Sequence, residues 1–108
     1  MAVPGYESYM ARTRRVTAAA CLLELSGFME RHYTVDLAYT GAALPETQCQ
    51  SDLSSHYTFS LVDDKLTQRT YTIQAAPIGN QANDACGTLG IDQAGTKTYK
   101  DGANSCWQ

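Results

Sequence analysis

Four residues with catalytic potential lie close together in the sequence. Ser54 and Ser55 precede His56, and Asp52 lies two positions before Ser54, so every residue type of a Ser-His-Asp hydrolase is present. The members of such a triad must face one another across a site, and neighbours on a single loop cannot readily do so. We therefore expect no catalytic residue in this stretch.

Two adjacent acids, Asp63 and Asp64, offer a carboxylate pair or two calcium ligands. Acids between two strand-like segments are more often turn residues, and we predict a turn here. The sequence also contains no Gly-rich phosphate loop, no HExxH and no GxSxG. These observations argue against an ordinary metabolic enzyme, and we expect no cofactor and no metal.

The clearest chemical signal is a set of four widely spaced cysteines: Cys21, Cys49, Cys86 and Cys106. No two of them form a CxxC pair, and neither histidine lies beside a cysteine, which argues against a zinc site or a thioredoxin-type site. An even number of cysteines in a small domain favours two disulfides and an oxidising compartment. Spacing alone leaves three pairings open.

The composition indicates one folded domain. The 108 residues are 44% hydrophobic and only 18% charged. The net charge is −3, so no global basic field favours nucleic acid, yet residues 1–15 carry +2 through Arg12, Arg14 and Arg15. This basic cluster is either a solvated helix face, a patch facing lipid headgroups, or a partner for an acidic surface on a neighbour. No signal-peptide segment precedes it, so we expect a targeting segment upstream of this chain.

The first third of the chain, residues 1–33, has the pattern of one long helix. Apolar residues recur at helical spacing, and the alanine run at 18–20 favours helix. We expect the sheet-facing side chains of the helix to be Val16, Ala20, Leu23 and Phe28. About 28 helical residues span about 40 Å, whereas a domain of this size has a radius of gyration of about 13 Å. One end of the helix should therefore project and meet a partner.

The remainder predicts a loop and a sheet. Residues 34–55 have the composition of a long loop with one short turn of structure, and residues 56–108 contain strand patterns at 56–62, 69–76, 86–92 and 96–99. Alternation predicts that the inward side chains are Tyr57, Phe59, Leu61, Tyr71, Ile73, Leu89 and Ile91. The fold class is α+β, with a long N-terminal α-helix packed on a four-stranded antiparallel sheet in one domain, 1–108.

Three stretches resemble the type IV pilin family, most closely its PilE-like minor pilins. The opening VPGYESYMARTRR is similar to the pilin helix just past its membrane-embedded half, and AACLLELSGFMERHYT is similar to the amphipathic half. The segment YTIQAAPIGNQANDACGTLGIDQAGTK, with the terminal CW, resembles the C-terminal hairpin and disulfide loop. Its most specific part is the combination YT-x-x-A-x-P-x-G-x-Q…CGTL-x-ID-x-x-G.

The resemblance implies a non-catalytic structural subunit of a type IV pilus that serves twitching motility, adhesion or DNA uptake. The subunit would be held in the inner membrane by a preceding helix segment, with a periplasmic head, and would later enter the extracellular fibre. Its partners would be major and minor pilins and the assembly machinery; no nucleic-acid partner is assured, and the head alone would be monomeric. Two alternatives stay open: a type II secretion pseudopilin, and a secreted, disulfide-stapled adhesin module.

The same resemblance implies two sets of site residues. We expect one disulfide from Cys21 to Cys49, tying the loop to the helix, and one from Cys86 to Cys106, closing the C-terminal region. The helix segment that contacts neighbouring subunits is expected to be exposed and to comprise Tyr6, Tyr9, Met10, Arg12, Arg14 and Arg15.

Overall fold

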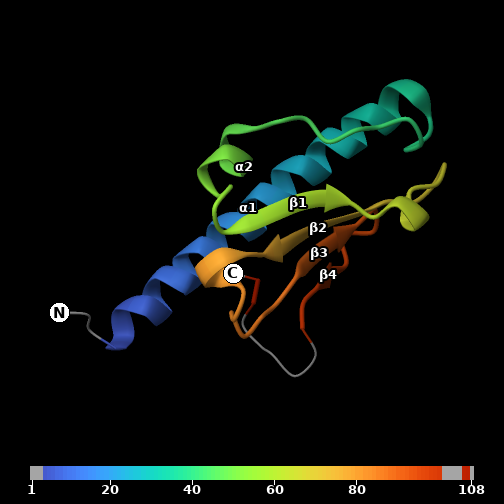
Figure 1. Cartoon of the computed structure of the whole chain (residues 1–108). Coiled ribbons are helices and arrows are strands. Elements are labelled where there is room, and N and C mark those ends of the chain that lie inside the picture. The colour runs from blue at the N-terminus through green and yellow to red at the C-terminus, as the bar shows by residue number, and fades with distance from the viewer. Residues whose placement is uncertain (1–3, 101–105, 108) are drawn as a thin grey trace.

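A long helix lies across one face of a small antiparallel sheet, and its N-terminal end extends beyond the sheet (Figure 1). The computed structural model describes residues 4–100 and 106–107, with side chains from residue 9 onward. The molecule measures 53 × 29 × 21 Å, and its length matches the roughly 50 Å of a 33-residue helix. Within the described residues, no helix is both long and apolar enough to cross a membrane.

The predicted fold class is confirmed. The helices are α1 (Pro4–Asp36), α2 (Gln48–Asp52) and the short 3₁₀ turns η1 (Asp63–Lys65) and η2 (Gly79–Gln81). The strands are β1 (Tyr57–Leu61), β2 (Thr72–Pro77), β3 (Leu89–Asp92) and β4 (Lys97–Thr98), and they pair antiparallel in sequence order. All four strands are shorter than predicted. For β3 the reason is a turn before it, in which the Gly87 N–H donates to the Asp84 carbonyl and Gly87 takes a positive φ of 58°.

The predicted loop 34–55 is shorter and more ordered than its composition suggested. Helix α1 continues three residues past 33 and ends where Leu37, at φ 57°, donates its N–H to the Tyr33 carbonyl. Within the loop, Thr47 and Gln50 form a capping box that starts α2. The Gln50 side chain accepts the Thr47 N–H at 2.9 Å. The T-x-x-Q spacing was present in the sequence and would have predicted this helix.

The alternation of residue types that was used to predict the strands also identified their buried faces correctly. Tyr57, Tyr71, Ile73, Leu89 and Ile91 are all at most 3% exposed. The other two predicted inward residues, Phe59 and Leu61, are partly buried and pack against the core. The β1–β2 hairpin runs in register from Tyr57 opposite Pro77 to Leu61 opposite Ile73, which leaves the polar residues of β1 on the other face.

The predicted orientation of α1 is wrong. Leu23 is 49% exposed and Ala20 is exposed, while Val16 and Phe28 are only partly buried. The helix residues that meet the sheet and loops are Ala18, Ala19, Cys21, Leu22, Leu25 and Met29. Helix α1 has two apolar stripes, and periodicity alone does not say which of them faces the sheet. The bond from Cys21 to Cys49 in α2 fixes that choice, because it turns the Cys21 side of α1 inward.

Both expected disulfides are present. Cys21 is bonded to Cys49 and Cys86 to Cys106, across 28 and 20 positions of sequence. In the loop-closure view, each restricts the unfolded chain and contributes about 3 kcal/mol. The first holds the loop and α2 against α1, and the second holds the end of the chain beside β3.

A tyrosine cluster joins the C-terminal part of α1 to the sheet. The Tyr39 hydroxyl donates to both carboxylate oxygens of Glu30, at 3.0 and 3.1 Å, and the Tyr71 hydroxyl donates to one of them at 3.1 Å. Burial, followed by other interactions that include Glu30, raises the pKa of both Tyr39 and Tyr71 to about 12. Both hydroxyls therefore stay protonated at neutral pH and remain donors, which fixes this end of α1.

Candidate assembly surface on the helix

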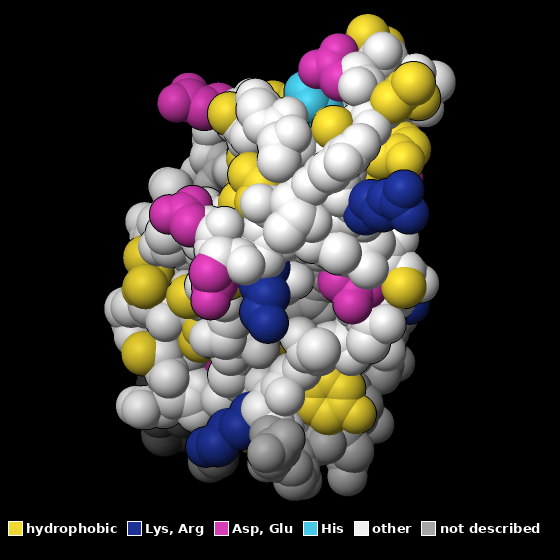
Figure 2. All heavy atoms as spheres, turned by 90° about the vertical axis from the view of Figure 1, so that its right-hand side faces the viewer, with side chains coloured by type: hydrophobic (Ala, Val, Ile, Leu, Met, Phe, Trp, Pro, Cys, Tyr) yellow, Lys and Arg dark blue, Asp and Glu magenta, His cyan; other side chains and the backbone are white. Residues whose placement is uncertain are grey.

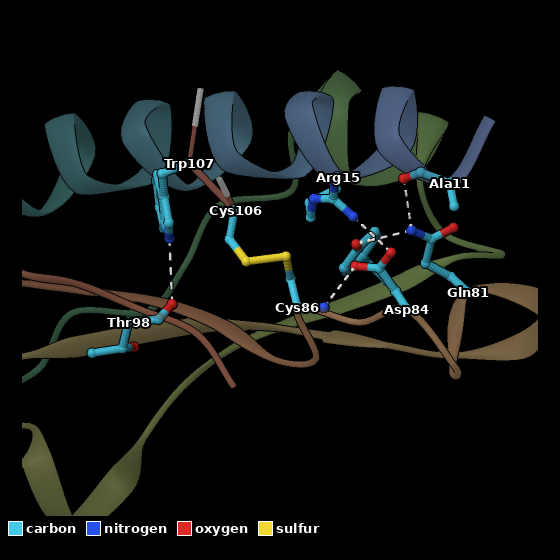
Figure 3. Close-up of a disulfide and its surroundings, with 9 residues drawn as sticks. Ala11, Arg15, Gln81, Asp84, Cys86, Thr98, Cys106 and Trp107 are labelled. Carbon is cyan, nitrogen blue, oxygen red and sulfur yellow. Dashed lines mark hydrogen bonds and ion pairs between the residues drawn. A yellow bond between two sulfur atoms is a disulfide. The ribbon is translucent and has the colours of Figure 1, made fainter. Parts of the chain in front are cut away.

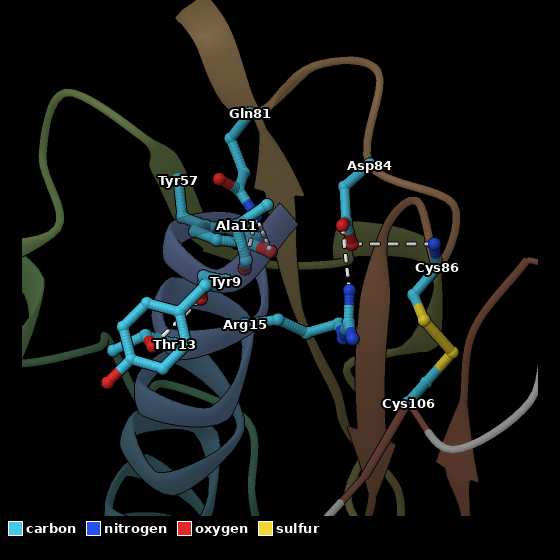
Figure 4. Close-up of polar contacts among 9 residues, drawn as sticks. All are labelled: Tyr9, Ala11, Thr13, Arg15, Tyr57, Gln81, Asp84, Cys86 and Cys106. Carbon is cyan, nitrogen blue, oxygen red and sulfur yellow. Dashed lines mark hydrogen bonds and ion pairs between the residues drawn. A yellow bond between two sulfur atoms is a disulfide. The ribbon is translucent and has the colours of Figure 1, made fainter. Parts of the chain in front are cut away.

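The face of α1 that points away from the head forms a continuous stripe of small and apolar side chains. We call Tyr9, Thr13, Val16, Ala20 and Leu23 the outer stripe; these positions are three or four residues apart, so they share one helix face. Tyr9 is 65% exposed. Figure 4 shows Tyr9 and Thr13 on the side of α1 away from Asp84. The outer stripe is the second apolar face of α1.

The threonines on this face need no outside hydrogen-bond partner. The Thr13 hydroxyl donates to the Tyr9 carbonyl at 2.9 Å, and the Thr17 hydroxyl donates to the Thr13 carbonyl at 3.0 Å. Their polar atoms are thus already satisfied within α1. A shallow groove of about 220 Å³ lies here, lined by Tyr9, Arg12, Thr13, Val16 and Thr17. The face therefore suits packing against an apolar surface.

The predicted subunit-contact residues differ in how exposed they are. Tyr9 and Arg12 are exposed, and Met10 and Arg14 are partly buried. The side chain of Tyr6 lies outside the described residues. Their role in assembly stays a prediction.

Arg15 departs from the expectation that the whole segment is exposed. Its Nη1 donates to Asp84 Oδ1 at 2.7 Å, and the two side chains are only 14% and 5% exposed (Figure 4). The partner is 69 positions away in the sequence, so no local pattern pointed to it. Arg15 therefore holds α1 to the head and is not free to meet a neighbouring subunit.

A second contact fixes the N-terminal part of α1 in the same region. The buried Gln81, at 1% exposure, donates from Nε2 to the Ala11 carbonyl at 2.9 Å and to the Tyr57 hydroxyl at 3.2 Å. Asp84 also accepts the Cys86 N–H at 3.4 Å, which connects this region to the second disulfide (Figure 3). The η2 loop thus sets the angle at which α1 leaves the head. A polar groove of about 500 Å³ lies between the two elements, and Arg12 and Arg14 are among its lining residues.

The other candidates from the sequence have structural partners. The His56 Nδ1 lies 2.9 Å from the Asn80 amide oxygen, and Asp63 and Asp64 form the turn η1, as predicted. Among the side chains that the structure describes, 9–100 and 106–107, no group of three from His, Cys, Asp or Glu is placed to hold a metal. Trp107 is partly buried against the core and donates to the Thr98 carbonyl at 3.3 Å (Figure 3). The Lys97 ammonium lies 5.5 Å from the centre of its ring.

Comparison with known proteins agrees with this architecture. A family model described as type IV minor pilin ComP, DNA uptake sequence receptor, matches residues 4–90. A type IV pilin from Shewanella oneidensis is 26% identical, with a TM-score of 0.68 over 91% of this chain and 98% of that one. The Neisseria meningitidis non-core minor pilin PilV is 20% identical and shares the fold, with a TM-score of 0.69 over 93% of this chain and 96% of that one. No match was found among curated protein sequences.

The predicted resemblance to type IV pilins is therefore confirmed. Pilins are structural and not enzymatic subunits, which agrees with the expectation of a non-catalytic protein. The match to the family model extends from the first described turn of α1 to β3, so it includes both apolar faces of the helix and most of the sheet. On this basis the chain belongs to the family of the type IV minor pilin ComP, the DNA uptake sequence receptor.

Proposed function

We propose that this chain is a minor pilin that enters a type IV pilus by packing the outer stripe of α1 against the helices of neighbouring subunits. The observation that carries the proposal is the second apolar face of α1. One face is buried on the sheet, whereas the opposite one leaves Tyr9 and Leu23 at 65% and 49% exposure. Soluble monomers rarely leave a continuous apolar patch open unless it has a partner.

The cellular location that we propose follows from the family and the disulfides. Type IV pilins are held in a membrane before they assemble. Two disulfides fit a head that folds in an oxidising compartment such as the periplasm. We place the subunit in the inner membrane with a periplasmic head before assembly, and in the extracellular fibre afterwards. Its partners are then other pilins and the assembly machinery.

Leu23→Asp in the full-length protein tests the assembly role. We expect the amount of subunit in sheared pili to fall by about ten-fold or more, because burying an unpaired carboxylate between helices costs several kcal/mol. The melting temperature of the head should stay close to the original value, since Leu23 is not one of the buried residues of the core.

The matched control is Ile78→Asp, which places the same charge at an apolar side chain that is 37% exposed in the loop after β2. This variant should enter pili normally. Normal incorporation of Leu23→Asp would reject the outer stripe as the assembly surface.

DNA binding is a second candidate function, and a different surface favours it. The family model is named for a DNA uptake sequence receptor. On and beside β4, Lys97, Tyr99 and Lys100 are exposed, and Lys97 lies over the Trp107 ring. Cations beside aromatic rings are typical of nucleic-acid surfaces. We propose that the subunit contacts DNA here, in spite of its overall charge of −3.

The double variant Lys97→Glu/Lys100→Glu tests this candidate. We expect its affinity for duplex DNA, measured by fluorescence anisotropy, to fall by about ten-fold or more, with a flatter dependence on salt. Lys65→Glu, at an exposed lysine in η1, is the control for one change in charge and should bind as the original does. Equal binding by all three proteins would contradict a β4 site.

A further inference from the structure

The polar groove between the N-terminal part of α1 and the η2 loop has the size of a ligand site. Its volume is about 500 Å³, and small-molecule sites commonly have about 300–1,000 Å³. Figure 4 shows Arg15 pointing from α1 toward Asp84 of the loop, and Gln81 pointing from the loop toward Ala11 of α1. The polar side chains that line this groove include Arg12, Arg14, Arg15, Gln81, Asn83 and Asp84.

The polar groove carries a positive charge although the whole chain is negative. Its lining residues in the described part of the chain include three arginines and one aspartate, which gives a net charge of +2, against −3 for all 108 residues. The aspartate, Asp84, is already paired with Arg15 at 2.7 Å. Arg12 and Arg14 have no carboxylate within ion-pair distance among the described side chains. Because guanidinium groups bind phosphate oxygens through pairs of hydrogen bonds, the two unpaired arginines favour a ligand that carries a phosphate.

Two buried atoms of residues that line the groove have no hydrogen-bond partner within the described structure. They are Arg15 Nε, which is a donor, and Gln81 Oε1, which is an acceptor. Gln81 is 1% exposed, and its Nε2 already donates to the Ala11 carbonyl and the Tyr57 hydroxyl. Buried polar atoms are nearly always hydrogen-bonded, so these two indicate a ligand that accepts one hydrogen bond and donates another. An anion without a hydroxyl group supplies only the first of these.

The polar groove lies at the end of the head from which α1 projects. Figure 1 shows η2 beside the N-terminal half of α1, far from the β1–β2 turn. Arg12 lies eight residues after Pro4, which corresponds to about 12 Å along α1. In the membrane-held state that we propose for the subunit, this end of the head faces the lipid headgroups. The inference rests on the proposed function in this respect.

We propose that the polar groove binds the phosphate of an anionic phospholipid headgroup, with phosphatidylglycerol as the class that fits. The phosphate oxygens accept hydrogen bonds from Arg12 and Arg14 and from Arg15 Nε, while a hydroxyl of the glycerol headgroup donates to Gln81 Oε1. A headgroup that ends in an ammonium fits less well, because it brings a second cation into a groove of net charge +2. The contact holds the head at the membrane surface before assembly.

Sedimentation of the 108-residue chain with lipid vesicles tests the site. The probe is vesicles of phosphatidylglycerol and phosphatidylcholine in equal parts, compared with phosphatidylcholine alone. We expect Arg12→Gln/Arg14→Gln to lower the affinity for the anionic vesicles by about ten-fold or more, because each basic residue at an anionic membrane contributes several-fold to binding. Binding to phosphatidylcholine alone should be weak for every variant.

The matched control is Lys65→Gln/Arg69→Gln, which removes the same two charges at exposed residues between β1 and β2. Figure 2 looks onto that end of the molecule, where basic side chains lie singly among acidic ones. This control should bind the anionic vesicles as the original chain does. An equal loss in both double variants would overturn the site, because the attraction would then follow net charge alone.

A change of nearly constant shape tests the position within the groove. Asn83 is exposed and lines the groove, so Asn83→Asp places a carboxylate beside the expected phosphate. We expect vesicle affinity to fall by about five-fold, since like charges repel. Gln68→Glu adds the same charge at an exposed amide between β1 and β2 and should leave the affinity unchanged. Unchanged binding by Asn83→Asp, with a melting temperature close to the original, would contradict a phosphate at this position.

Soluble probes distinguish the lipid from other phosphates. Glycerophosphoglycerol should displace the chain from anionic vesicles more strongly than inorganic phosphate at equal ionic strength, because it fills more of the groove and offers hydroxyl donors to Gln81 Oε1. Stronger displacement by inorganic phosphate would assign the groove to free phosphate and overturn the lipid site. A loss of duplex-DNA affinity in Arg12→Gln/Arg14→Gln, with vesicle binding unchanged, would likewise overturn it in favour of nucleic acid. None of these measurements involves pili, so their failure is distinct from a failure of the assembly role, which Leu23→Asp tests.

Discussion

Leu25→Ala is expected to lower the free energy of unfolding by about 2–5 kcal/mol, whereas Leu23→Ala should lower it by less than about 1 kcal/mol. The two residues are two positions apart on α1 and have the same side chain. Leu25 is fully buried in the core, and Leu23 is 49% exposed on the outer stripe. Removing the Leu25 side chain leaves a cavity under the helix, while removing that of Leu23 only uncovers solvent-facing surface.

Urea unfolding of the isolated chain, followed by far-ultraviolet circular dichroism, measures both values under the same conditions. Leu22→Ala supplies a second buried position, since Leu22 is also at 0% exposure. Equal losses for Leu23 and Leu25 would mean that α1 is rotated relative to the head. The proposed assembly surface would then be buried, so this pair of variants also tests the basis of the proposed function.

Local patterns in the sequence were sufficient to predict the elements of this fold. Along each strand, large apolar residues alternate with smaller or polar ones. The positions of Tyr57, Ile73, Leu89 and Ile91 therefore identified the buried face of the sheet. The apolar residues at helical spacing and the alanine run at 18–20 likewise predicted α1. The strand ends were less predictable, because they depend on turns such as the one that places Gly87 at positive φ before β3.

The orientation of α1 was not predictable from periodicity, because the helix has two apolar faces. A helix with one apolar face has one way to pack on a sheet. Here a second apolar face is kept free, and Ala20 and Leu23 are as hydrophobic as many core residues. The information that decides between the faces is non-local: it lies in the bond from Cys21 to Cys49 and in the contact of Tyr71 with Ser26 at 2.6 Å. A helix with two apolar faces therefore misleads a prediction that assumes one apolar face.

The environments of the three arginines in the basic cluster were also not predictable from local sequence. Arg12, Arg14 and Arg15 are neighbours in sequence and were expected to act together. Helical geometry turns Arg14 away from Arg12, whereas Arg12 and Arg15, three residues apart, lie on neighbouring sides of α1. All three arginines line the polar groove beside η2, but Arg12 is exposed, whereas Arg15 is only 14% exposed and is paired with Asp84. Reversing all three charges would mix an assembly effect with a folding effect, and a clean test of assembly changes only Arg12 and Arg14.

Arg15→Met is expected to lower the free energy of unfolding by about 3 kcal/mol. The substitution leaves the carboxylate of Asp84, whose side chain is 5% exposed, without its counter-charge, and removing one partner of a buried ion pair is strongly destabilising. Arg12→Met is the matched control, because Arg12 is exposed and outside any ion pair of the described side chains. It should change stability by less than about 0.5 kcal/mol.

The double variant Arg15→Met/Asp84→Asn separates the loss of the pair from the loss of packing. The Cys86 N–H now lies 3.4 Å from Asp84 Oδ2, and an asparagine side chain would keep an oxygen to accept it while carrying no charge. We therefore expect the double variant to recover most of the stability lost in Arg15→Met, measured by urea unfolding. If the double variant is as unstable as Arg15→Met alone, the aliphatic part of Arg15 and not its charge holds α1 to the head.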